Sequence, residues 1–220
     1  MAQLLAGHVP LTPPLFGWLK RRPPPTVDSA ASQRVRATTP WLLHLDETRD
    51  ATLQALADGF LHQKRITPLA GLTLDDDERL QLAALCCLPL IGLGANGWAG
   101  WSQVLVYPDA FRVRRSHTDA AGVLHEYEDE LAGESWDVGP LILSWADVQA
   151  DLAEPDAGFC VAIHEMAHKL DALDGEMDGT PPLPRAWQRQ WAEDFQRRYD
   201  AFCAEVDAGH DTAIDPYASE

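Results

Sequence analysis

The residues of this chain whose types and spacing most clearly indicate chemistry form the pattern His-Glu-x-x-His. They are His164, Glu165 and His168. Because residues four apart lie on the same face of an α-helix, the two histidines can offer imidazole nitrogens to one metal ion. Glu165 directly follows the first histidine, which is the position of the general base in zinc peptidases. The pattern predicts a metallopeptidase site with one Zn²⁺ per chain; the alternative is a hydrogen-bonded histidine in the core.

The reaction that this site predicts is hydrolysis of a peptide bond. Glu165 would take the proton of a water activated by zinc and pass it to the leaving amine. Tyr217 is a candidate for stabilising the tetrahedral oxyanion, with simple packing as the alternative. Asp171 and Asp174 are candidates for hydrogen-bonding the outer nitrogens of the histidines, with surface carboxylates at a helix end as the alternative.

A catalytic zinc site also needs a third protein ligand and an open position for water. Asp174 follows His168 at a spacing that imitates metzincins, but Asp171 stands where metzincins have the glycine that turns the chain back to the metal. Glu220 lies beside its own α-carboxylate, where a chain end frays. A glutamate beyond residue 220 is the remaining candidate. The residues alone do not choose among the three.

The elements that must position the site follow from hydrophobic periodicity. The motif lies in a predicted helix over residues 157–173, ended by Gly175, whose apolar positions cover much of its circumference, as expected for a helix inserted into a core. A last long helix is predicted over residues 184–206. Its aromatic side chains recur at spacings of three and four and predict a buried face: Trp187, Trp191, Phe195, Tyr199 and Phe202.

The rest of the chain predicts short helices and strands. Further helices are predicted over residues 45–61, 75–88 and 145–152, the last capped by Ser144. Strands are predicted at residues 104–107, 111–113 and 139–143, the last buried on both faces. Residues 92–100 predict a loop, and residues 117–136 are polar without a predicted element. We therefore expect an α+β fold, zincin-like, mostly helical, with a small β-sheet and an active-site helix carrying His-Glu-x-x-His.

Composition excludes several classes of protein. The formal net charge of −17 argues against direct binding of nucleic acid, because phosphate contacts need clustered Lys and Arg. No apolar run is long enough for a membrane span, and the first residues do not have the pattern of a signal peptide. The cysteines form no C-x-x-C pair, and the apolar surroundings of Cys86 and Cys87 predict buried free thiols. A reducing cytoplasm is the expected location.

The first forty residues differ from the remainder. Residues 1–40 are rich in proline, which blocks helix formation and sheet pairing, so we expect a tail or lead-in before a peptidase domain over residues 41–220. The basic cluster Lys20-Arg21-Arg22 is expected to be solvated, with anionic lipid or nucleic acid as the alternative contact.

Several segments resemble the Mlc titration factor A family of zinc-dependent peptidases. They are residues 60–69, 85–89, 104–108, 139–145 and 163–182, and the resemblance covers about residues 42–220 in order. It implies a cytoplasmic peptidase with one zinc, possible activity as an aminopeptidase, and a catalytic core similar to that of anthrax lethal factor. By the family pattern His164 and His168 are zinc ligands and Glu165 is the catalytic glutamate.

The resemblance also implies a third ligand and a partner. The family's third ligand is a glutamate that follows the tyrosine matching Tyr217, which counts to about position 224, so the domain is expected to be truncated at its C-terminal end. Family members are named for sequestering a glucose-responsive transcriptional repressor. The expected partners are a peptide or protein substrate and a Mlc-like repressor. The alternative functions are a non-catalytic repressor-binding module and an inactive fragment lacking the third ligand.

Overall fold

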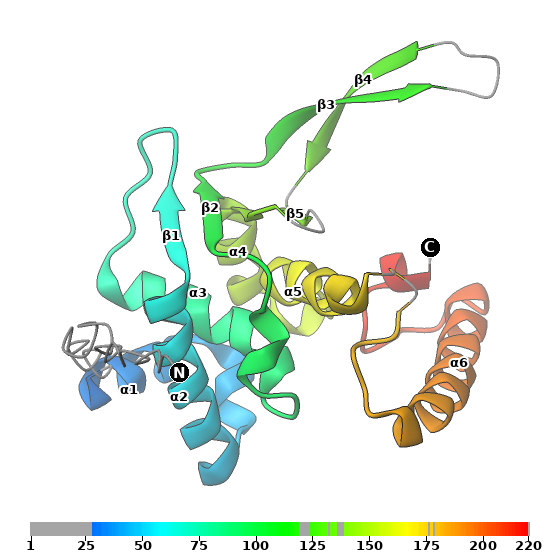
Figure 1. Cartoon of the computed structure of the whole chain (residues 1–220), viewed down its shortest axis with the longest axis horizontal. Helices are drawn as coiled ribbons and strands as arrows, with labels where there is room; N and C mark the ends of the chain where they lie inside the picture. Colours follow the sequence, from blue (N-terminus) through cyan, green and yellow to red (C-terminus); the bar gives the residue numbers. More distant parts are fainter. Residues whose placement is uncertain are drawn as a thin grey trace, which may run out of the picture.

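The computed structural model describes residues 28–118, 124–131, 133–135, 139–175, 177 and 179–219 (Figure 1). The helices are α1 (Ser29–Thr38), α2 (Glu47–Gln63), α3 (Asp76–Cys87), α4 (Trp145–Ala153), α5 (Val161–Asp171) and α6 (Arg185–Asp207). The strands are β1 (Arg65–Pro68), β2 (Gln103–Tyr107), β3 (Phe111–Thr118), β4 (Leu124–Leu131), β5 (Gly133–Ser135) and β6 (Leu141–Ser144). Short 3₁₀ turns are η1 (Pro40–His44), η2 (Leu88–Leu90), η3 (Ala95–Trp98), η4 (Pro155–Ala157), η5 (Ala172–Asp174) and η6 (Pro216–Ser219). The prediction of a mostly helical fold with a small sheet is confirmed.

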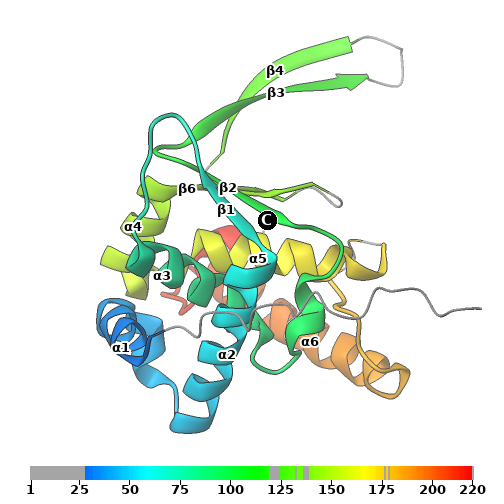
Figure 2. The ribbon, with the colours of Figure 1, turned by 60° about the vertical axis from the view of Figure 1, so that its left-hand side comes forward.

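The main sheet has the strand order β1–β2–β6–β5. The first three strands are parallel, and β5 pairs antiparallel with β6 at one edge. All four residues of β6 are buried, as its unbroken apolar run predicts, whereas β2 buries alternate residues. Helix α5 packs against β5 and β6, below the sheet in the view of Figure 2. The sheet therefore packs along one side of the motif helix α5.

Helices α2 and α3 pack against each other and form the helical part of the core. Asp46 caps α2, and Asp75 caps α3 in a reciprocal capping box with Glu78, so acids at these helix starts satisfy free backbone N–H groups. The second half of α3 is buried throughout, including the free thiols of Cys86 and Cys87. The prediction that both cysteines are buried free thiols is confirmed. Burial raises the pKa of both thiols, which keeps them protonated.

The prediction that residues 1–40 form an irregular lead-in is wrong for residues 29–38. These residues contain no proline and form α1, which begins after the N-cap Asp28. Val35 of α1 is 3% exposed and belongs to the main core. The predicted tail residues 1–27, with the basic cluster, lie outside the described residues.

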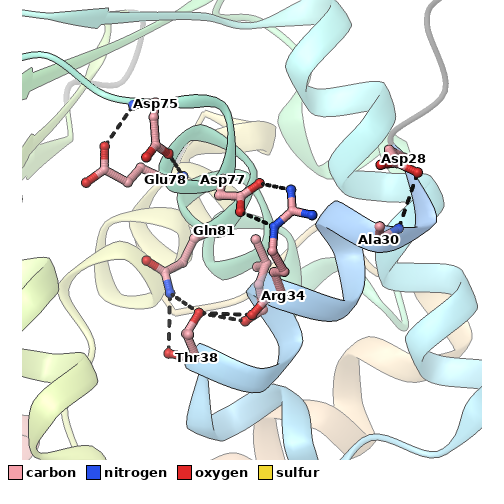
Figure 3. A network of polar contacts seen from close by, with 9 residues as sticks. Asp28, Ala30, Arg34, Thr38, Asp75, Asp77, Glu78 and Gln81 are labelled. Carbon is pink, nitrogen blue, oxygen red and sulfur yellow. Dashed lines mark hydrogen bonds and ion pairs between the residues drawn. The ribbon is translucent and has the colours of Figure 1, made fainter.

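Polar contacts hold α1 against α3 (Figure 3). Arg34 makes a two-point ion pair with Asp77, with Nε–Oδ2 at 2.6 Å and Nη2–Oδ1 at 2.8 Å. Gln81 of α3 donates from its amide to Thr38 and, at 3.0 Å, to the buried hydroxyl of Thr39. The two-point pair is exposed, so it orients the helices more than it stabilises them.

Three strands were not predicted from the sequence. β1 has four residues and ends at Pro68, β5 has three residues and begins at Gly133, and β4 alternates charged residues. None of these carries the apolar run that marks a strand. β4 pairs antiparallel with β3 in a hairpin that extends away from the main sheet in Figures 1 and 2.

Helix α6 forms where it is predicted, but the expectation that its aromatic face is core is wrong. No residue of α6 is buried. Trp187 is 63% exposed, Phe195 50% and Tyr199 36%. Figure 1 shows α6 to one side of the body, joined to α5 by a loop. Along the described residues, no helix combines the length and apolarity needed to cross a bilayer.

Candidate metal centre

The residues of the motif lie on α5, which begins four residues later than predicted. Gly158 adopts the left-handed φ of 78° that ends η4, and Cys160 is extended, so the helix starts at Val161. The carbonyl of Gly158 accepts a hydrogen bond from the Asp215 N–H at 3.2 Å. A Cβ at Gly158 would lie 2.7–2.9 Å from the backbone of residues 213–215. Glycine is therefore required at position 158 for two reasons: the positive φ, and the close approach of the backbone of residues 213–215.

A carboxylate from α4 caps the start of α5. Cys160, the N-cap residue, makes no side-chain cap, and Asp151 Oδ2 accepts from the Val161 N–H at 2.7 Å instead. Burial raises the pKa of Asp151 to about 6, opposed by this hydrogen bond and assisted by the nearby Asp147. The contact fixes the N-terminal end of α5 one turn before the first histidine.

The two histidines of the motif face each other. Nε2 of His164 and Nε2 of His168 are 3.1 Å apart, and the rings are nearly perpendicular with centroids at 4.6 Å. Both side chains are partly exposed. Burial, and after it the neighbouring His168, lower the pKa of His164, which favours its neutral form at neutral pH. Two nitrogen lone-pair positions therefore meet at one partly open point on the surface of α5.

The side of α5 next to the histidines is buried and contains charged groups, because each histidine is followed directly by one. Glu165 is 5% exposed and Lys169 is 2% exposed. Lys169 Nζ donates to the Gly139 carbonyl at 2.8 Å, next to β6, and lies 5.5 Å from the ring centre of Trp101. These contacts join the motif helix to the chain that leads into the sheet.

A second buried lysine, Lys64, lies at the same indole. Its Nζ is 3.9 Å from the ring centre of Trp101 and donates to the carbonyls of Trp98 and Trp101. Burial, and after it the charge of Lys169, lower the pKa of Lys64 to about 8. The loop that carries both tryptophans is thereby fixed behind α5.

Tyr217, a candidate from the sequence, lies beside the first histidine. Its ring centroid is 6.1 Å from that of His164 and 6.4 Å from that of Phe159, which in turn is 5.5 Å from His164. Tyr217 lies on η6 and is 57% exposed. The segment after α6 thus folds back over the entry to α5 and brings a phenol to the edge of the histidine pair.

Similarity to known proteins identifies the family of this chain. Residues 17–220 match the family described as glucose-regulated metallo-peptidase M90. The chain belongs to this family. It is 37% identical over 209 residues to "Mlc titration factor A" of Pectobacterium atrosepticum, an alignment that covers 93% of this chain and 77% of the relative. It is 37% identical to the protein of that name from Escherichia fergusonii (82% and 68% covered) and 35% identical to that from Yersinia enterocolitica (93% and 77% covered).

Membership of the M90 metallopeptidase family implies a metal ion, and the histidine pair fits one. Two nitrogens at Zn–N distances near 2.05 Å in a tetrahedral site are separated by about 3.3 Å. The observed separation of 3.1 Å between the Nε2 atoms is close to this value. Imidazole nitrogens on a partly open helix face are also donors that zinc prefers, and the lowered pKa of His164 favours the neutral form that binds a metal.

Among the residues that the structure describes, no third predicted donor joins the pair. Asp171 Oδ1 accepts from the Gly179 N–H at 2.8 Å, so it fixes the following loop. The side chain of Asp174 and the whole of Glu220 lie outside the described residues. Within the described residues, no group of three His, Cys, Asp or Glu side chains could hold a metal ion. The described residues therefore supply two candidate metal donors, His164 and His168.

One surface hollow among the described residues lies away from the histidine pair. It has a volume of about 830 Å³, sits at the first half of α2 beside Ala95, and includes none of the motif residues. It is wide and open and is lined mainly by alanine and threonine, with Glu47 as the one charged residue of its lining. We therefore place the candidate site at the histidine pair.

Two residues that shape the candidate site were missed in the sequence. Asp151 caps α5 from ten residues before Val161, and Lys169 lies on a buried, mostly apolar face of α5 that also holds Glu165. The second carried a signal, because a lysine within an apolar helix face needs a buried acceptor. The first carried none, because its partner is a backbone N–H on another element.

Proposed function

We propose that this protein is a zinc-dependent peptidase in which His164 and His168 hold the metal and Glu165 is the general base. The observation that carries the proposal is the 3.1 Å separation of the two Nε2 atoms on one helix of an M90 family member. The zincin-like fold and the active-site role of α5 are parts of the same proposal.

Each side chain of the proposed site has a distinct task. Bound zinc supplies Lewis acidity for the scissile carbonyl and lowers the pKa of water. His164 enters the site as a neutral ligand, because burial and His168 lower its pKa. The Glu165 carboxylate accepts a proton from the attacking water and delivers it to the nitrogen of the leaving amine. The hydroxyl of Tyr217 donates to the developing oxyanion, for which its place beside His164 is suitable.

Metal content tests the ligands. We expect about one zinc in each purified wild-type chain by mass spectrometry of the metal, because the paired imidazoles supply two of its donors. His164→Ala removes one donor and is expected to lose the zinc. The matched control is His44→Ala, an exposed histidine on η1. Zinc content that is equal in His164→Ala and in the wild-type chain would refute the assignment.

Peptide hydrolysis tests the base. Glu165→Gln is expected to keep the zinc and the fold but to lower kcat by about a hundredfold or more, because the amide cannot accept the proton of the water. The assay follows cleavage of aminoacyl chromogenic substrates and of blocked peptides, which separates aminopeptidase from endopeptidase action. Undiminished hydrolysis by Glu165→Gln would exclude this mechanism.

The second candidate function is a binding module for a Mlc-like transcriptional repressor. It is favoured by the name "Mlc titration factor A" of the relatives and by the presence of only two donors among the described residues. The test is titration calorimetry of the metal-free chain and of Glu165→Gln with a purified repressor of this type. If a chain that holds no zinc and hydrolyses no peptide still binds the repressor, the result supports the binding module. Peptide hydrolysis by a chain that holds one zinc supports the peptidase.

The proposed location is the cytoplasm. All four cysteines are free, and Cys86, Cys87 and Cys160 are buried. Burial raises the pKa of Cys160 to about 11, so this thiol is protonated and unreactive. A chain with four unpaired thiols fits a reducing compartment.

A further inference from the structure

A polar hollow lies at the edge of the main sheet formed by β1, opposite the edge formed by β5 (Figure 1). It has a volume of about 400 Å³ and sits where α2 ends and where β1 and β2 begin. This volume lies within the range of about 300–1,000 Å³ that is typical of sites for small molecules. The residues that line the hollow are His62, Gln63, Lys64, Arg65, Ser102 and Gln103.

The lining of this hollow contains bases and no acid, although the chain as a whole is acidic. The sequence has 34 acidic and 17 basic residues, apart from histidine. Of the six lining residues, three are lysine, arginine or histidine, and none is aspartate or glutamate. The other three are glutamine or serine, whose amide and hydroxyl groups donate hydrogen bonds. Such a lining favours an anion that carries several acceptor oxygens.

Lys64 brings a buried positive charge to the hollow. It is 6% exposed, and its Nζ donates to the carbonyls of Trp98 and Trp101. An ammonium group has three N–H donors, and among the residues that the structure describes Nζ has neither a third acceptor nor a carboxylate partner. The charge of Lys169, which lowers the pKa of Lys64, adds to the positive potential. An anion that approaches Lys64 would therefore stabilise its charged form.

Two further donors close to Lys64 are without acceptors in the described part of the chain. The indole Nε1 of Trp101 is buried and makes no hydrogen bond there, and Lys64 Nζ lies 3.9 Å from the centre of the same ring. Arg65 is exposed, and its guanidinium makes no hydrogen bond or ion pair with a described residue. Buried donors in folded proteins are normally satisfied, so a free Nε1 beside a buried ammonium indicates a ligand with acceptor oxygens.

We propose that the hollow between α2, β1 and β2 binds the phosphate group of a small molecule, with the exposed Arg65 and the buried Lys64 as its cationic partners. Arg65 matches two phosphate oxygens through parallel N–H donors, and Lys64 supplies a point charge. The volume leaves room beside the phosphate for a hydroxylated body, which the amide and hydroxyl groups of the lining suit. The site includes no residue of the histidine pair and does not depend on the proposed peptidase function.

Titration calorimetry of the full chain at constant ionic strength gives the first test, with inorganic phosphate, glycerol phosphate and glycerol as probes. We expect one phosphate per chain with a Kd of about 1 mM or lower, because a few charge-assisted hydrogen bonds supply this affinity. Glycerol lacks the phosphate and is expected not to bind. Tighter binding of glycerol phosphate than of inorganic phosphate identifies a phosphate ester as the ligand, and equal binding identifies inorganic phosphate.

Charge changes in the lining test the place of binding. Arg65→Glu reverses an exposed charge and is expected to raise the Kd at least about thirtyfold. Ser102→Asp adds a carboxylate at another exposed lining position, and Lys64→Met removes the buried charge, so both are expected to weaken binding to a similar extent. The matched control is Arg189→Glu, which makes the same charge change at an exposed position on α6 and is expected to keep the wild-type Kd.

The outcomes separate this site from binding elsewhere. Absence of saturable binding of both phosphate compounds to the wild-type chain overturns the proposal. An unchanged Kd in Arg65→Glu, or an equal loss in Arg65→Glu and Arg189→Glu, also overturns it, because phosphate then binds elsewhere or responds only to net charge. Circular dichroism checks the fold of each variant. The two substitutions at exposed positions keep the test valid if Lys64→Met does not fold.

Discussion

The cap that Asp151 places on α5 gives the sharpest test of how the site is held. Its Oδ2 accepts the Val161 N–H at 2.7 Å, and the N-cap residue Cys160 supplies no cap of its own. Asp151→Ala leaves that N–H without its acceptor, which costs about 1–2 kcal/mol of unfolding free energy. Asp151→Asn keeps an acceptor oxygen and removes the charge, so it separates the hydrogen bond from the ionisation.

The charge of Asp151 sets the sign of the pH dependence. Burial raises its pKa from 3.8 to about 6, so ionising the carboxyl costs more in the folded than in the unfolded chain. The stabilisation by the neutral form is complete below pH 3.8 and is lost as the pH rises through about 6. At 1.36 kcal/mol per pH unit the full effect is at most about 3 kcal/mol, and solvent screening of a half-buried group reduces it to about 1 kcal/mol.

Urea unfolding at pH 5.2 and pH 7.5 measures both effects, at pH values above the isoelectric point of 4.7. We expect Asp151→Ala to be less stable than the wild-type chain at both pH values. We expect Asp151→Asn to gain about 0.5 kcal/mol relative to the wild-type chain between pH 5.2 and 7.5, because only the wild-type group ionises. Asp156→Asn, an exposed acid on η4, is the control. A wild-type stability for Asp151→Ala, or a pH-independent difference for Asp151→Asn, would refute the reasoning.

Two further substitutions test the supports of the site. Gly158→Ala is expected to lower the free energy of unfolding by about 1–3 kcal/mol and to increase hydrogen exchange in residues 213–215, because the added Cβ would meet their backbone. The control is Gly209→Ala, because Gly209 has a similar left-handed φ but open space around it, so that this variant measures backbone strain alone. Lys64→Met is expected to cost about 1 kcal/mol in urea unfolding at pH 7, because the two tryptophan carbonyls lose their donor. Since burial lowers the pKa of Lys64 to about 8, the wild-type chain should become more stable relative to Lys64→Met as the pH rises through 8. Equal stability of the two chains below and above pH 8 would contradict this account.

The elements that the sequence predicted correctly are those with local signals. Asp46 and Asp75 cap the helices that follow them, and Ser144 accepts from the Asp147 N–H at 3.3 Å. The apolar run of β6 is buried throughout. In each case the residues that make the structure are adjacent in the chain, so spacing alone carries the information.

The elements that the sequence did not predict depend on distant partners. β1 exists because the neighbouring β2 completes its hydrogen bonds, with Ile66 in register with Val104. The start of α5 depends on the crossing of residues 213–215 over Gly158. Periodicity located the apolar face of α6 correctly, but periodicity records only that a face is apolar and not which molecule covers it.

The same distinction applies to the metal centre. The motif placed two imidazoles on one face of α5, and their Nε2 atoms lie 3.1 Å apart. The helix does not turn back after them: it runs on to Asp171, whose carboxylate is bonded to the loop at Gly179, and continues as η5. The segment that does approach the pair is η6, which brings Tyr217 to within 6.1 Å of His164, measured between ring centroids. The segment that approaches the histidine pair therefore comes from the chain after α6, because α5 itself leads away from the pair.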